Sequence, residues 1–96
     1  MNEQEIIEWY RTLDKKEIGD GLEMVREMSN QFGSEVFREA TEVYLAGLEE
    51  FRLRYGSRSP KVCEEKGLDY VTEISARVYW AVEQSREVVN ARRRMQ

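Results

Sequence analysis

The spacing of its apolar residues is the feature that most constrains the fold of this 96-residue chain. Apolar residues recur every three or four positions along nearly the whole sequence, which is the period of an amphipathic α-helix. No segment alternates cleanly between apolar and polar residues, as a half-buried strand would, and the chain has a single proline. The pattern predicts an all-α fold, a small helical bundle in one domain covering residues 1–96.

Capping residues and glycines divide this pattern into four main helices and one short helix. Ser59 followed by Pro60 is typical of an N-cap and a first helical position, and Asp69 is a cap for the helix that follows. Glycines at positions 33, 56 and 67 are typical of helix ends. The expected main helices are residues 3–13, 15–32, 35–55 and 69–94, and the expected short helix is residues 60–66.

The start of the second helix stays open between residues 15 and 21. Two capping boxes compete for it, Asp14 with Glu17 and Asp20 with Glu23. The apolar stripe that begins at Ile18 favours the earlier start. Gly19 and Gly21 favour the later one, because each costs about 1 kcal/mol inside a helix.

Composition excludes several classes of active site. The chain has no histidine and one cysteine, Cys63, so it cannot supply a Ser-His-Asp triad, a Cys-His pair or the four ligands of structural zinc. Many glutamates of the 35–55 helix have arginine neighbours three or four residues away, which is typical of a solvated, charge-laced face. We therefore expect no cofactor, no metal site and no catalytic residues, and a function that is not enzymatic.

The sequence also gives an expectation for the cellular location of the protein. The first residues are acidic and lack the apolar region of a secretion signal, and no apolar run is long enough to span a bilayer. A single cysteine rules out a disulfide within the chain. We expect a cytoplasmic protein that does not insert into membranes.

Trp80 is the first candidate for contact with a partner. It lies on the helix face opposite the main apolar stripe of residues 69–94, and Ala76 shares that face. Tryptophan is enriched at protein interfaces, but another helix of the same chain can equally cover it, and the sequence leaves both options open. Leu45 and Leu53 fall off the stripe of their own helix and suggest a second contact face.

These four interface candidates predict a protein-interaction or regulatory module that acts through helix faces. A chain of this length buries only a small core, which a second copy would extend. We therefore expect a homodimer, with a protein partner or self-association as the mode of action.

Basic residues support a first alternative, a DNA-binding regulator. Residues 1–50 carry 5 Lys/Arg and 13 Asp/Glu, whereas residues 51–96 carry 10 and 6. Residues 58–77 have the order of a degenerate helix-turn-helix, with a short helix, a glycine turn and a capped second helix. Residues 92–96 are expected to form a frayed basic tail. The basic patch candidates are Arg52, Arg54, Arg58, Lys61, Arg92, Arg93 and Arg94.

A second alternative is a small helical enzyme or ligand binder for an anionic metabolite. Tyr44, Tyr55 and Tyr79 would line its pocket between helices, and arginines would bind the anion. Without histidine, such an enzyme would depend on Arg, Glu or Tyr for its chemistry.

Overall fold

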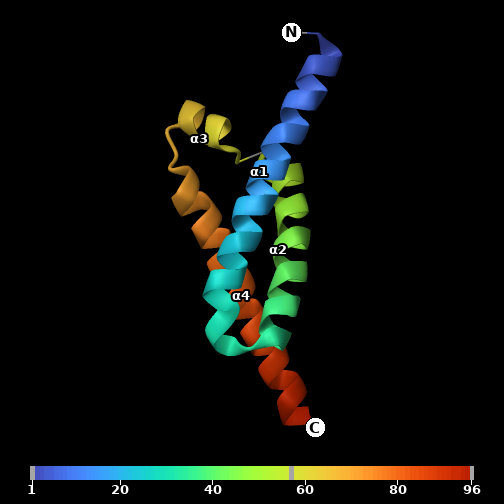
Figure 1. The fold of residues 1–96 in the computed structure, drawn as a ribbon, viewed down its shortest axis with the longest axis vertical. Helices are drawn as coiled ribbons and strands as arrows, with labels where there is room; N and C mark the ends of the chain where they lie inside the picture. Colours follow the sequence, from blue (N-terminus) through green and yellow to red (C-terminus); the bar gives the residue numbers. More distant parts are fainter. Residues whose placement is uncertain (1, 57, 96) are drawn as a thin grey trace.

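Three long helices form an elongated bundle in the computed structural model, which describes residues 2–56 and 58–95 and, for residues 6–14 and Tyr55, the backbone alone. They are α1 (Glu3–Ser29), α2 (Ser34–Tyr55) and α4 (Tyr70–Met95). A 3₁₀ turn, Asn30–Phe32, follows α1, and the short α3 (Pro60–Lys66) lies beside one end of the bundle (Figure 1). The molecule measures 55 × 24 × 21 Å. The described residues contain helices and no strand, so the all-α prediction is confirmed.

The first long helix differs from the prediction. The expected break between residues 13 and 15 is wrong, because Glu3–Ser29 forms one helix and the bundle has three long helices instead of four. The competing caps Asp14 and Asp20 both lie inside this helix. The helix starts at Asn2 instead, whose Oδ1 accepts a hydrogen bond from the backbone N–H of Glu5 (2.8 Å). An internal cap contributes about 1 kcal/mol, less than the several intrahelical hydrogen bonds that a break would remove.

The bounds of α2, α3 and α4 agree with the prediction to within one residue. Gly56 and Gly67 end α2 and α3 at positive φ values of 81° and 71°, where a side chain would strain the backbone. Ser59 is the N-cap of α3, because its side chain accepts a hydrogen bond from the backbone N–H of Val62 (3.3 Å). The capping serine and the terminal glycines therefore lie at the helix ends that the sequence predicts.

Asp69 caps α4 as predicted, and this cap gives a testable pH dependence. Its Oδ2 accepts hydrogen bonds from the backbone N–H (3.0 Å) and the hydroxyl (2.5 Å) of Thr72. These hydrogen bonds hold the pKa of Asp69 below its ordinary value of 3.8. Because the folded-state pKa is the lower one, the carboxylate stabilises the fold above about pH 4, and this contribution is lost as the pH falls.

We expect Asp69→Asn, which keeps a capping oxygen but no charge, to lose less stability than the wild type between roughly pH 5 and pH 3. Urea unfolding at both pH values measures this difference. Equal losses in the two proteins would contradict the proposed role of the Asp69 carboxylate.

The hydrophobic core lies where α1, α2 and α4 face one another. Two residues of the predicted stripes, Phe37 and Val71, remain 38% and 56% exposed, because each lies near the start of its helix at an end of the bundle. The buried core residues lie on the predicted stripes except Val36, which the stripe of its helix does not include. The buried side chains are Val25, Val36, Ala40, Tyr44, Leu48, Ile74, Val78, Ala81, Val82 and Val89.

A buried ion pair links α1 to α4. Glu17 is 1% exposed, and its Oε1 lies 2.6 Å from Nη2 of Arg77. The backbone carbonyl oxygen of Glu17 accepts a hydrogen bond from the hydroxyl of Tyr44 on α2 (3.1 Å). One turn later, Asp20 Oδ2 accepts a hydrogen bond from the hydroxyl of Tyr70 on α4 (2.7 Å). Polar contacts from both other long helices thus converge on the middle of α1.

The Tyr44 side chain reaches α1 at Gly21. A Cβ atom at Gly21 would overlap the ring and the hydroxyl of Tyr44, so this close approach requires a glycine. One of the two glycines that favoured a helix break is therefore a packing residue inside an unbroken helix.

The segment before α3 is held by Arg58 and Cys63. Cys63 is fully buried, its Sγ donates a hydrogen bond to the carbonyl oxygen of Arg58 (3.4 Å), and burial raises the pKa of the thiol. The guanidinium carbon of Arg58 lies 5.2 Å from the centre of the Phe51 ring, and its Nε lies 3.9 Å from Oε2 of Glu73. These contacts fix the connection between α2 and α4 at that end of the bundle.

Candidate interaction groove between α2 and α4

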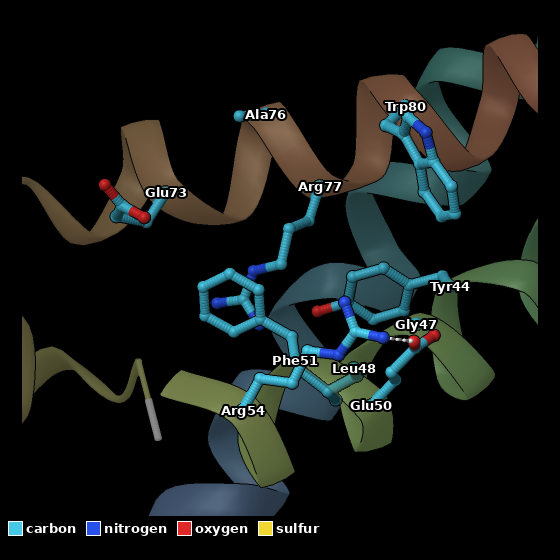
Figure 2. A pocket seen from close by; sticks show the side chains of 10 residues that line it. All are labelled: Tyr44, Gly47, Leu48, Glu50, Phe51, Arg54, Glu73, Ala76, Arg77 and Trp80. Carbon is cyan, nitrogen blue, oxygen red and sulfur yellow. Dashed lines mark ion pairs between the residues drawn. The ribbon is translucent and has the colours of Figure 1, made fainter. Parts of the chain in front are cut away.

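A groove of about 390 Å³ lies between α2 and the first half of α4 (Figure 2). Its walls come from two helices that run side by side along the bundle. Most of its lining is apolar, with charged groups at the edges. From α2 it is lined by Tyr44, Gly47, Leu48, Glu50, Phe51 and Arg54, and from α4 by Glu73, Ala76, Arg77 and Trp80.

Trp80 forms one wall of this groove and is 52% exposed. Its indole extends from α4 toward α2 (Figure 2). A Cβ atom at Gly47 would lie 3.4 Å from Cζ3 of Trp80, a van der Waals contact distance, so the indole packs against α2 at Gly47. Trp80 is therefore partly covered within its own chain, and about half of its surface remains accessible.

The floor of the groove is aromatic and rigidly held. Burial raises the pKa of Tyr44 to about 12, and the Tyr44 hydroxyl donates a hydrogen bond to the Glu17 carbonyl. The guanidinium carbon of Arg77 lies 4.6 Å from the centre of the Phe51 ring, a cation–π distance. The floor is held by contacts to all three long helices, so a molecule that enters the groove meets a preformed surface.

The charged side chains of the groove are paired within the chain. Arg54 Nη2 lies 2.9 Å from Glu50 Oε1 across the α2 edge, as the dashed line in Figure 2 marks. Arg77 is paired with the buried Glu17, and Glu73 lies opposite Arg58 at 3.9 Å. This pairing does not favour an anionic ligand, because both lining arginines already have a carboxylate partner.

The structure brings together two of the four interface candidates. Ala76 and Trp80 both line the groove. Leu45 and Leu53 are 40% and 83% exposed but do not line it, and their positions on α2 face away from the groove residues of that helix. These two leucines stay predictions for a separate contact face.

Two of the three tyrosines expected around a metabolite pocket, Tyr44 and Tyr79, do not lie together. Tyr44 lies in the floor of the groove, whereas Tyr79 is 63% exposed on another face of α4 and does not line it. The side chain of Tyr55 lies outside the described residues. Of the two tyrosines whose side chains the structure describes, Tyr44 lines the groove and Tyr79 does not.

The basic patch candidates form two groups, one at the end of α2 and in the segment that follows it, the other at the end of α4 (Figure 1). The first follows the end of α2, and there the Arg58 side chain is only 15% exposed. The second lies at the end of α4, where Arg92 and Arg93 reach Glu39 and Glu35 of α2 at 3.3 and 3.9 Å. The helix continues to Met95, and fraying of the tail stays a prediction.

The helix order expected for the DNA-binding alternative is present in α3, Gly67 and α4. The inner face of α4 is occupied by the bundle core, because Ile74 and Val78 are fully buried. Of the basic candidates in this segment, Lys61 is exposed and Arg58 is largely covered. DNA binding stays a prediction that none of these contacts specifically favours.

Sequence reasoning missed Arg77 as a groove residue. Arg77 lies three residues before Trp80 and four after Glu73, which places all three on neighbouring parts of one helix face. That spacing is the signal that would have found it. Its buried partner Glu17 lies 60 residues earlier, and the sequence offers no local sign of this pairing.

Two classes of site find no support in the described part of the chain. Among the side chains that the structure describes, no group of three His, Cys, Asp or Glu residues is placed to bind a metal ion. Within the same described residues, every helix is too short or too polar to cross a membrane.

No protein-family model matches the sequence, and comparisons with curated proteins and with solved structures likewise find no match.

Proposed function

We propose that this chain is a non-enzymatic protein-interaction module that binds its partner through the α2–α4 groove, with Trp80 as the main contact residue. The observation that supports this proposal is a half-exposed tryptophan beside a preformed apolar groove. Tryptophan is among the residues that contribute most to binding energy in protein interfaces.

The charge pairing within the groove makes this surface suitable for burial. A partner that covers Glu50, Arg54 and Glu73 does not bury an isolated charge, because each has an oppositely charged neighbour within the chain. The unpaired element is the indole of Trp80, whose exposed half gains from removal from water. Binding is thus driven by the apolar wall and floor.

Site-specific photocrosslinking in cells that make the protein tests this proposal. A photoreactive amino acid replaces Ala76 in the groove, and a control replaces Val71, which is 56% exposed on the opposite face of α4. We expect a crosslinked product at position 76, absent at position 71 and lost with Trp80→Ala. Equal products at both positions, or a product that survives Trp80→Ala, would contradict the proposal.

Self-association is a separate prediction of the sequence analysis. Sedimentation velocity of the purified chain over a range of concentrations tests it directly, with the mass of 11.4 kDa as the monomer reference. A homodimer that dissociates on Trp80→Ala would identify a second copy as the partner of the groove.

A further inference from the structure

We propose that the groove receives a basic amphipathic helix from a different protein, and that this helix lies along α4; the inference rests on the proposed function. The observation behind it is a stripe of residues on the Trp80 face of α4 and just before its first turn. This acidic–aromatic stripe consists of Asp69, Glu73, Ala76, Trp80, Glu83 and Glu87.

The spacing of the stripe fits a second helix. Its members follow one another at intervals of four and three residues, the spacing by which one helix contacts another along a shared seam. The nineteen residues from Asp69 to Glu87 are separated by eighteen steps, which extend about 27 Å at the rise of a helix. Trp80 and Ala76 occupy the centre, next to the groove, so an apolar side chain of the docked helix enters the groove there.

The charge of the stripe selects a basic partner. Its four charged members are all acidic, and Asp69 and Glu87 are exposed. Two of the four are paired within the chain, Glu73 with Arg58 at 3.9 Å and Glu83 with Arg86 at 2.9 Å, whereas Asp69 and Glu87 form no ion pair with the described residues. The other arginine of the stretch, Arg77, is directed to the buried Glu17. The segment from Asp69 to Glu87 keeps two more acids than bases, and the two carboxylates without an ion pair lie at its two ends.

The same charges argue against a second copy of this chain on the stripe. Two copies meeting through it would place four carboxylates against four carboxylates, and like charges at an interface oppose association. Nucleic acids and anionic membrane surfaces are repelled for the same reason. A helix with lysines or arginines on both sides of an apolar seam complements both parts of the stripe.

Binding of synthetic helical peptides to the purified chain tests this inference. The probe is a labelled peptide of about 20 residues with leucine at the seam positions and lysine at the flanking ones, and its twin carries glutamate in place of lysine. We expect the basic peptide to bind, the acidic twin not to bind, and the affinity to fall as salt is raised. The NMR chemical shifts that change when the peptide is added should belong to residues 69–87, including the indole of Trp80.

Charge-reversal variants separate docking on the stripe from general attraction to an acidic protein. Glu83→Lys with Glu87→Lys should weaken binding about 10-fold. The matched control, Glu42→Lys with Glu49→Lys, changes the net charge equally on exposed positions of α2 away from the groove and should have little effect. Trp80→Ala should weaken binding by about 30-fold or more, with the fold checked by circular dichroism.

Several outcomes would overturn the inference. Equal loss of binding in both charge-reversal pairs would show that the peptide is attracted to the net charge of the protein and not to the stripe. Equal binding of the acidic twin, or no binding of the basic peptide, would show that the charge of the stripe does not select a basic partner. A homodimer that depends on Trp80 would give the groove a different occupant and leave the proposed function intact. Absence of any crosslink at Ala76 would instead overturn the proposed function itself.

Discussion

Replacing Glu17 with alanine is expected to lower the free energy of unfolding by about 3–5 kcal/mol, because it leaves the guanidinium of Arg77 buried without its carboxylate. Glu17 is 1% exposed and the Arg77 side chain 15%, so little water reaches the pair. Domains of this size are stable by roughly 5–15 kcal/mol, so the variant should be only marginally folded at room temperature. Urea unfolding followed by circular dichroism measures the change.

The control for this prediction removes both partners. Glu17→Ala combined with Arg77→Met should be more stable than Glu17→Ala alone, because the methionine leaves no charge in the interior and keeps contact with Phe51. A single variant as stable as the wild type would mean that Arg77 reaches solvent when Glu17 is absent, and that the ion pair contributes little.

Replacing Gly21 with alanine is the second large effect. In an exposed helix interior this substitution stabilises by about 1 kcal/mol, but here the new methyl group would overlap the Tyr44 ring. We expect a loss of about 1–3 kcal/mol, typical of overpacking a filled core, with the transition temperature and urea midpoint both lowered.

Gly19 provides the matched control, since a Cβ atom there meets nothing within 4 Å. Gly19→Ala should stabilise the protein by up to about 1 kcal/mol. In a Tyr44→Ala background, the cost of Gly21→Ala should largely disappear, because the overlapping ring is gone. If Gly19→Ala and Gly21→Ala had the same effect, the close approach of Tyr44 to α1 would be ruled out.

The helices were predictable because most residues of their apolar stripes are buried. Val25, Tyr44 and Val78 occupy stripe positions in the sequence, and each is buried in the bundle. The error fell on the middle of α1, where cap-like residues and glycines suggested a break. Cap-like residues and glycines do not by themselves end a helix. Here the close packing of Tyr44 against Gly21 favours a continuous α1.

The candidate site was predictable in part. Trp80 and Ala76 stood out because apolar residues on the polar face of a helix need a second contact. Arg77 and Glu17 did not, since charged residues in amphipathic helices are ordinarily solvated and their pairing joins two distant parts of the chain. Leu45 and Leu53 satisfied the same local criterion as Trp80, but only the tertiary arrangement of α2 and α4 shows which exposed apolar residues border a groove.

The length of the bundle has a consequence for anything joined to it. Asn2 and Met95 lie at opposite ends of a molecule whose long axis measures 55 Å (Figure 1). Domains fused before α1 and after α4 would be attached at opposite ends of the helical bundle and held apart by its length. A partner bound in the groove would then lie on the side of the bundle, between the two fused domains.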